Sequence, residues 1–479
     1  MKSFAAFFMS AATLLHSVIG DSDYAQGGFN KGHVVVYKPD EAELTYKIPS
    51  QVRRVRPLWA TNGRRRQRLL KSTVSSSPVV NRSPREDLAA MSISDIHRIA
   101  KDKLEPAVRQ YYESGADQEQ TLKENREAFN RLRFRPKLLV DVSRINTATT
   151  LLGRPVSMPV GFSPSAMHQL AHPDGEIGTA QAAEAAGTVM ILSTLSTVAL
   201  EDIRRRAPNC TLWLQTYLYK NRALTEALVK RAVNAGFSAI VLTSDSPVFG
   251  HKMKPSKYRF SLPRHLRLDN LARSMAEANA AARTAFDSFM DDLISPSVVW
   301  SDIAWLRRVS GVPVVVKGVL TPEAAVNALR SGAAAIIVSN HGGRQLDGTP
   351  ASIDALPAIA AAVGKRLEVY LDSGVRTGAD VAKALALGAR AVFVGRPVLW
   401  GLAYNGRAGV CTVLDIFRAE LERTLKLLGC PDISVLSQEY VVHKDYYSSY
   451  HYFNSRCHST SENDRIDQLN STMDIKHFR

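Results

Sequence analysis

Residues 312–340 read VPVVVKGVLTPEAAVNALRSGAAAIIVSN and contain the repeating unit that decides the fold. A short apolar run rich in β-branched residues is followed by an alanine-rich helical segment and then by a second apolar run. Runs that are apolar at nearly every position are typical of parallel strands whose two faces are both covered. We therefore predict a parallel sheet with helical crossovers.

The same alternation extends from about Met158 to Pro397. Eight strands with intervening helices over this length favour a closed α/β barrel, the (β/α)8 TIM barrel, over an open doubly wound sheet. No G-x-G-x-x-G follows the first run, which also argues against a dinucleotide-binding crevice. The eight runs are MPVGFSP (158–164), TVMILS (188–193), TLWLQTYL (211–218), AIVLTSD (239–245), VPVVVKG (312–318), AAIIVSN (334–340), LEVYLDS (367–373) and AVFVGRP (391–397).

The barrel domain is predicted to span residues 91–430, with residues 431–479 as a C-terminal tail. It opens with an N-terminal helical extension, for which Ser94 is the candidate N-cap and Gly115 the stop. Between the fourth and fifth runs, residues 246–311 form a connection far longer than the others, which we interpret as a mobile flap over the site.

The N-terminal ninety residues have a different composition. Residues 1–20 carry a lone lysine, an apolar stretch and a small-residue end, as in a secretory signal peptide, which predicts the secretory pathway or an extracellular location. A membrane anchor or an artefact of the gene model stays open, although the stretch is short for a stable membrane span and His16 interrupts it. Residues 21–90 keep no helix or strand period and are interpreted as a basic, disordered linker.

The net charge of +16 is concentrated in this linker. Ten basic and no acidic residues lie between Ser50 and Arg85, and subtracting ten from +16 leaves +6 for the rest of the chain. Such a distribution does not indicate a binding face for nucleic acid on the folded domain. The cluster itself can be a solvated tail, a processing site at residues 64–66 or an arm that binds polyanions.

Each apolar run acquires polar or reactive residues at its C-terminal end. In a barrel these ends converge on one face, which is where catalytic groups belong. The residues are Ser163, Pro164 and Ser165; Ser193; Gln215 and Tyr217; Thr243 and Asp245; Lys317; Ser339, Asn340 and His341; Asp372, Ser373 and Gly374; and Gly395 and Arg396.

The last two runs end in DSGVR and GRP, which suggest phosphate binding. Gly374 and Gly395 allow backbone N–H groups to approach an anion, and Arg376 and Arg396 supply charge and paired donors. Lys317 would be an uncompensated buried cation unless it meets an anion, or unless it is a structural lysine paired with Asp or Glu.

The segment SNHGGRQLDG (339–348) combines a proton acceptor with a carboxylate anchor. His341 can accept a proton near neutral pH, and two glycines allow a tight turn that brings Arg344 to the same cavity. This pair suits an anionic substrate that loses a proton. Asp245 can orient the imidazole, as in other His–Asp pairs, or can cap a helix; a purely structural role for His341 is the other alternative.

At these residues the chain closely resembles the FMN-dependent 2-hydroxy acid dehydrogenase family, which includes glycolate oxidase and flavin-dependent L-lactate dehydrogenases. The resemblance extends from about Ser92 to Cys430. The motifs that carry it are YYESGA, FRPKLLVDVS, FSPSAMHQLAHPDGE, LQTYLYKN, LTSDSP, VKGV, VSNHGGRQLDG, LDSGVRTG and VFVGRPV.

The resemblance implies an enzyme that oxidises an L-2-hydroxy acid to a 2-oxo acid, with hydride transfer to N5 of FMN. It implies that His341 takes the hydroxyl proton, that Asp245 and Tyr217 assist, that Lys317 stabilises negative charge on the reduced flavin, and that no metal takes part. The substrate would contact Tyr111, Leu195, Tyr217, Lys252, His341 and Arg344. FMN would contact Pro164, Ser165, Ala166, Ser193, Gln215, Tyr217, Thr243, Lys317, Ser339, Asp372, Ser373, Gly374, Val375, Arg376, Gly395 and Arg396.

The partners implied by the family are oxygen or an external electron acceptor and further copies of the chain in a homotetramer. The family is typically peroxisomal or mitochondrial, which is the alternative to export. Two competing functions stay open: another FMN barrel of the type 2 isopentenyl diphosphate isomerase kind, which His341, Arg344 and Tyr111 argue against, and a secreted binding protein that has lost turnover.

Three positions depart from the family pattern. Lys252 stands where the family usually has a second carboxylate-binding arginine, and it keeps the charge but loses the planar fork. Ser373 replaces the first glycine of an Asp-Gly-Gly sequence and can crowd the phosphate loop. Leu195 replaces the bulky aromatic residue of glycolate-preferring members, so lactate or a longer hydroxy acid is favoured over glycolate.

Overall fold

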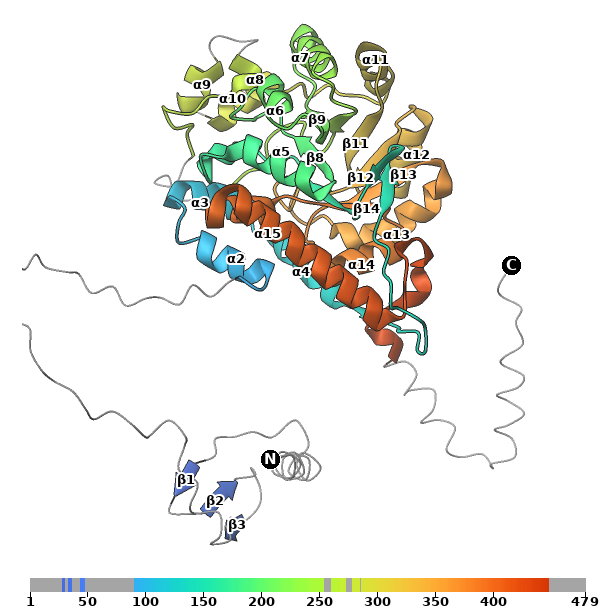
Figure 1. Ribbon diagram of the computed structural model, residues 1–479. Coiled ribbons are helices and arrows are strands. Elements are labelled where there is room, and N and C mark those ends of the chain that lie inside the picture. Colours follow the sequence, from blue (N-terminus) through green and yellow to red (C-terminus); the bar gives the residue numbers. More distant parts are fainter. Residues whose placement is uncertain are drawn as a thin grey trace, which may run out of the picture. The chain divides into compact units, whose positions relative to one another are not determined.

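The computed structural model describes residues 90–253, 260–272, 278–284 and 286–447, and three short strands nearer the N-terminus (Figure 1). The chain divides into two units, residues 1–85 and 86–479. The predicted signal peptide and the basic cluster of residues 50–85 lie outside the described residues.

The first unit contains a small antiparallel sheet that the sequence does not predict. Its strands pair in the order β1-β2-β3. Each strand has only three or four residues, which is too short for an alternating pattern to be recognised. The strands are β1 (Gly28–Asn30), β2 (His33–Val36) and β3 (Leu44–Lys47).

The second unit contains the predicted eight-stranded barrel, which is thereby confirmed (Figure 1). All eight strands are parallel to their neighbours and close in the order β10-β11-β12-β13-β14-β7-β8-β9. Each strand coincides with one of the eight apolar runs. They are β7 (Val160–Phe162), β8 (Val189–Leu192), β9 (Thr211–Thr216), β10 (Ile240–Thr243), β11 (Val314–Val319), β12 (Ala335–Val338), β13 (Glu368–Leu371) and β14 (Ala391–Val394).

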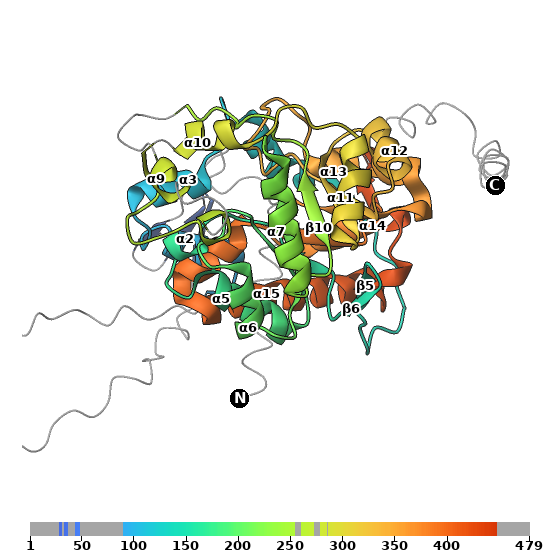
Figure 2. The ribbon, with the colours of Figure 1, turned by 90° about the horizontal axis from the view of Figure 1, so that it is seen from above.

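A helix follows each strand and covers the outside of the barrel. Helices α7 and α11 lie side by side outside β10 (Figure 2). The eight are α5 (Gly175–Ala186), α6 (Leu200–Arg206), α7 (Arg222–Asn234), α11 (Ser301–Ser310), α12 (Pro322–Arg330), α13 (Ser352–Val363), α14 (Gly378–Ala386) and α15 (Arg396–Leu428); η2 (His168–Leu170) and η4 (Gly364–Arg366) are short 3-10 turns.

Large side chains fill the interior of the barrel. The rings of Trp213, Tyr370 and Phe393, from three strands, lie 5.5–5.8 Å apart between centroids. Gly161 leaves the space for one of them, because a Cβ there would come within 2.6 Å of the Phe393 ring. The hairpin of β5 (Thr149–Leu151) and β6 (Arg154–Val156) adds Leu151 and Val156 to this cluster. The barrel is therefore a packed core and not a pore.

The N-terminal extension differs in detail from the prediction. Its first helix is α2 (Ile93–Ala100), and the N-cap is Ser92, whose hydroxyl accepts from the Asp95 N–H at 3.1 Å; the choice of Ser94 was wrong. A separate helix, α3 (Pro106–Glu113), begins at Pro106, which lacks an N–H and disfavours helical geometry in the residue before it. The third helix is α4 (Gln120–Asn130).

The long connection after β10 is partly helical. Its described helices are α8 (Asp269–Ala272), α9 (Ala278–Thr284) and α10 (Phe286–Leu293). Phe260 stacks on Tyr111 of α3 with ring centroids 4.3 Å apart, and Phe286 meets the same ring edge-on. The connection therefore reaches the N-terminal extension, and its role as a flap stays a prediction.

The C-terminal part closes the outside of the barrel. Helix α15 packs against α2, α5 and α14 and is kinked at Asn405 and Gly406 (Figure 1). The chain then forms η5 (Ile433–Val435), η6 (Gln438–Tyr440) and β15 (Val441–His443), which pairs with β4 (Leu132–Phe134). In the described part of the chain, no helix has the length and hydrophobicity that a membrane span requires.

Candidate active site

The carboxyl ends of the barrel strands border two adjoining cavities of about 750 and 520 Å³. Pro164, Ser165, His341 and Arg396 line both. Every residue predicted to bind a ligand lines at least one cavity, apart from Ser339. Ser339 and the predicted catalytic residue Asp245 lie one layer behind, where they hold Lys317 and His341. The structure therefore brings the predicted set together.

His341 follows β12 and begins a tight loop. The backbone φ angles of His341, Gly342 and Gly343 are +58°, +69° and +73°. A Cβ at Gly343 would lie 2.6 Å from the backbone nitrogen of Leu122, so both the conformation and the space require glycine. This loop directs the imidazole of His341 toward both cavities.

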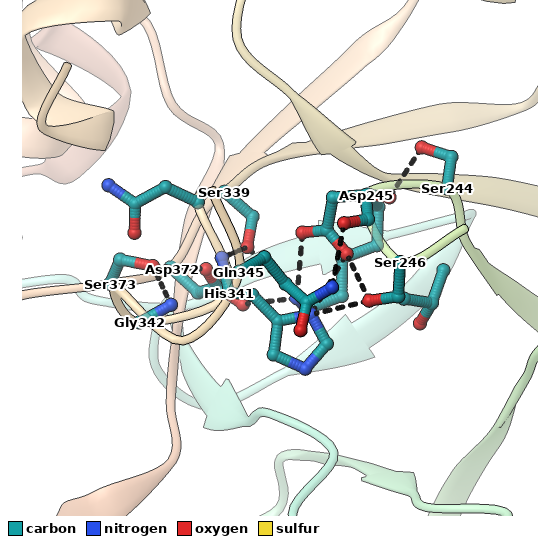
Figure 3. Close-up of polar contacts among 12 residues, drawn as sticks. Ser244, Asp245, Ser246, Ser339, His341, Gly342, Gln345, Asp372 and Ser373 are labelled. Carbon is teal, nitrogen blue, oxygen red and sulfur yellow. Dashed lines mark hydrogen bonds and ion pairs between the residues drawn. The ribbon is translucent and has the colours of Figure 1, made fainter. Parts of the chain in front are cut away.

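Asp245 holds the imidazole of His341 (Figure 3). Its Oδ1 lies 2.8 Å from His341 Nδ1, and Ser246 Oγ lies 3.1 Å from the same oxygen and 3.4 Å from Nδ1. A proton on Nδ1 leaves Nε2, on the opposite side of the ring, as the acceptor. Asp245 therefore orients the imidazole as predicted and does not cap a helix.

Burial favours a neutral imidazole in this pair. Burial and the Lys317 cation lower the pKa of His341 below 6.5, although the Asp245 carboxylate opposes them. Burial would raise the pKa of Asp245, but the charges of His341 and Lys317 outweigh it and hold the pKa at about 2. At neutral pH, His341 can therefore accept a proton beside an ionised carboxylate.

Lys317 is buried between two carboxylates. Its Nζ donates to Ser339 Oγ at 2.9 Å and lies 3.5 Å from Asp372 Oδ2 and 4.0 Å from Asp245 Oδ2. Of the alternatives that the sequence left open for Lys317, the structure shows the pairing with acidic residues, because Asp245 and Asp372 at the ends of β10 and β13 compensate its charge. Lys317 still lines the smaller cavity, where its charge faces any ligand.

Two further cations flank the ring of Tyr111 in the larger cavity. Arg344 Cζ lies 5.2 Å and Lys252 Nζ 5.6 Å from the ring centroid. The Nη1 of Arg344 donates to the carbonyl oxygens of Tyr111 and Ser114, which anchors the guanidinium to the end of α3. This arrangement can hold a small carboxylate close to His341.

The smaller cavity has the features of a phosphate site. Burial lowers the pKa of Arg376 to about 10, with a further contribution from Arg126, and burial among other arginines lowers the pKa of Arg396. An anion would relieve both effects. Gly374 has φ +91°, and a Cβ there would meet the Asn125 carbonyl oxygen, so only glycine allows this close approach of backbone.

Several residues of the site were not predicted. Tyr112, Phe249, Gln345 and Leu399 line the larger cavity, and Gly342, Phe393 and Val394 line the smaller one. Ser246 directly follows Asp245, and Gln345 directly follows Arg344, so adjacency to a predicted site residue could have identified both. Among the described residues, no group of three or more His, Cys, Asp or Glu side chains is arranged to hold a metal ion.

Comparisons with known proteins agree with this geometry. A family model described as FMN-dependent dehydrogenase matches residues 100–443. Glycolate oxidase 3 of Oryza sativa subsp. indica is 47% identical over 352 residues, which cover 73% of this chain and 96% of that protein. L-lactate oxidase of Nostoc sp. (strain PCC 7120) is 44% identical over 357 residues, covering 73% and 98%.

A solved structure is similar over the same part of the chain. It is mandelate oxidase with (S)-4-hydroxymandelic acid, with a TM-score of 0.70 and 36% sequence identity, and the match covers 74% of this chain and 99% of that one.

We predict that Asp245→Asn lowers the plateau of kcat/KM for 2-hydroxy acid oxidation by about 100-fold or more, because the imidazolium loses its counter-charge. The substitution also removes the charge that raises the pKa of His341, so the acidic limb of the pH profile should move to lower pH. The measurement is kcat/KM as a function of pH. Asp354→Asn, an exposed aspartate on α13, is the matched control. An unchanged plateau would contradict the assigned role of Asp245.

Proposed function

We propose that this member of the FMN-dependent dehydrogenase family, which oxidises 2-hydroxy acids with FMN, acts on L-2-hydroxy acids of lactate size or larger. In this proposal His341 is the base. One observation carries the proposal: His341, which is held by Asp245, borders a single cavity together with the Arg344 and Lys252 cations. That constellation suits a substrate with a carboxylate next to a hydroxyl group.

The residues present fit FMN. Gly374, Gly395, Arg376 and Arg396 would hold its phosphate in the smaller cavity, which is continuous with the larger one through shared lining residues. The other residues assigned to the cofactor from the sequence line the same two cavities or, for Ser339, support Lys317. When bound, FMN supplies the acceptor for the two electrons and the α-hydrogen of the substrate.

The remaining chemistry belongs to the side chains of this chain. Arg344 and Lys252 would bind the substrate carboxylate, and Tyr111 would hydrogen-bond the substrate between them. His341 Nε2 would take the hydroxyl proton, and Asp245 would stabilise the imidazolium that forms. Tyr217 can donate a hydrogen bond to the substrate at neutral pH, because burial raises its pKa.

Lys317 would place a buried positive charge next to the cofactor. Its two carboxylate neighbours keep that charge compensated while the flavin ring is uncharged. Additional negative charge arriving in the smaller cavity would therefore meet a cation that is already in place. Reoxidation by oxygen or another acceptor, assembly into a homo-oligomer and the cellular location stay predictions.

The size of the substrate side chain is proposed to depend on Leu195. This residue is 3% exposed and lines the larger cavity together with Leu399 and Phe249. An aliphatic side chain at this position leaves more room than the bulky aromatic residue expected in glycolate-preferring members. The relatives include both an L-lactate oxidase of Nostoc and glycolate oxidases of plants, so the proposal rests on the side chain at position 195.

We expect the wild-type chain to have a higher kcat/KM for L-lactate than for glycolate. One additional methyl group in a matching pocket corresponds to about 10-fold or more. Leu195→Trp should lower the lactate-to-glycolate ratio by about the same factor, because the indole fills the space of the methyl group. Leu195→Met conserves volume and should leave the ratio near the wild-type value. A strong preference of the wild-type chain for glycolate would refute the proposal.

We expect His341→Ala to lower kcat for L-lactate oxidation by about 100- to 10,000-fold, since a positioned base contributes that much. The FMN content of the purified variant should remain close to that of the wild-type chain, because the imidazole is not needed to hold the phosphate. His265→Ala, at an exposed histidine, is the control. Retained turnover in His341→Ala would exclude His341 as the base.

A further inference from the structure

Ser373 has a backbone conformation that serine rarely adopts. Its φ is +74°, in the left-handed region that favours glycine. The family pattern has glycine at this position, so serine carries a cost in conformational strain that glycine would avoid. A strained residue that borders a site indicates that its side chain has a role there.

The side chain of Ser373 bridges two parts of the site (Figure 3). Its Oγ donates to Asp372 Oδ1 at 2.9 Å and accepts from the Gly342 N–H at 2.9 Å. Asp372 lies 3.5 Å from Lys317 Nζ through its other oxygen, which also accepts from Ser163 Oγ at 3.1 Å. Ser373 therefore connects the loop that carries His341 to the carboxylate that neutralises Lys317.

Of the three amide groups in this loop, the one at Gly342 hydrogen-bonds to a residue that follows a neighbouring strand. The N–H of His341 donates to Ser339 Oγ, and that of Gly343 donates to Asn340 Oδ1, so both use acceptors from the same segment after β12. The N–H of Gly342, between them, uses Ser373 at the end of β13. The carbonyl groups of the loop have other partners: the Gly342 carbonyl accepts from Arg396 Nη1, and the Gly343 carbonyl accepts from the Ala116 N–H.

We propose that Ser373 is a positioning residue for His341: its hydroxyl fixes the Gly342 amide and thereby the imidazole relative to Asp245 and Lys317. This inference rests on the proposed role of His341 as the base. The family resemblance alone would assign position 373 to the phosphate loop, whereas these contacts direct its side chain to the loop that carries His341.

Two substitutions separate the hydroxyl from the backbone. Ser373→Ala removes the hydroxyl and retains a side chain in the strained conformation, whereas Ser373→Gly removes the hydroxyl and relieves the strain. Ser163→Ala is the matched control, because it removes a different hydrogen bond to Asp372 and none to the loop.

The first measurement is hydrogen exchange of the Gly342 amide in the FMN-bound chain, by mass spectrometry with fragmentation within residues 339–346. We expect exchange about 10-fold faster in both Ser373 variants, because the amide loses its acceptor. Ser163→Ala should exchange at the wild-type rate. Wild-type protection of Gly342 in both Ser373 variants would overturn the proposal.

The second measurement is kcat/KM against pH, together with Tm. Both Ser373 variants should lose about 10-fold in kcat/KM, and Ser373→Gly should do so with an unchanged or higher Tm. Greater contact with water should raise the pKa of His341, so the acidic limb of the pH profile should move to higher pH. The charged groups that face His341, namely Asp245, Lys317 and Arg344, are the same in both variants. Faster exchange with wild-type kcat/KM and an unmoved acidic limb would overturn the positioning role.

The two measurements also distinguish this inference from the proposed function. If the wild-type chain binds FMN but His341→Ala retains turnover, the base is misassigned and the proposed function fails. The exchange of Gly342 would still report whether Ser373 holds the loop.

Discussion

Positive charge buried at one end of the barrel is the constraint on which the rest of the structure depends. At the carboxyl ends of the strands, Arg344 borders the larger cavity, Lys317 and Arg376 border the smaller one, and Arg396 borders both. Asp245 and Asp372 neutralise Lys317, but burial still lowers the pKa of Arg376 and Arg396. Anionic ligands would relieve this cost, a phosphate in the smaller cavity and a carboxylate in the larger one. The preference for a phosphorylated cofactor and an acidic substrate thus follows from the same electrostatic imbalance.

Burial keeps His341 in the form that the reaction needs. It lowers the pKa of the imidazole, with a further contribution from Lys317, and Asp245 stabilises the charge that arises after proton transfer. Orientation matters as much as charge, because the imidazole is carried by a loop of three consecutive residues with positive φ. Contacts from Asp245, Ser246 and Ser373 surround this loop, and they come from the ends of β10 and β13. Side chains at the ends of two barrel strands thereby position the imidazole of His341, which stands on a loop outside the sheet.

The sequence was sufficient to predict the barrel and the membership of the site. Short, continuous apolar runs that alternate with helical segments are typical of parallel strands covered on both faces, and in a barrel the polar residues at their carboxyl ends converge. Apart from the Asp245–His341 pair, the contacts that depend on side-chain direction were not predicted. The sequence left open whether Lys317 meets a ligand anion or a structural carboxylate, because its neighbours Asp245 and Asp372 are distant in sequence. Ser373 was expected only to crowd a phosphate, since its contact with Gly342 requires a backbone conformation that serine rarely adopts. The break before Pro106 and the cap at Ser92 depend on local geometry that apolar spacing does not describe.

The most direct test of this account is an anaerobic titration of the purified FMN-bound chain with L-lactate, followed by the absorbance of the flavin. The account predicts that the oxidised flavin spectrum is lost in proportion to added lactate, with one pyruvate formed per flavin reduced. A chain that is folded but does not retain FMN would contradict it. So would a chain that binds FMN and keeps the oxidised spectrum in excess L-lactate and other L-2-hydroxy acids.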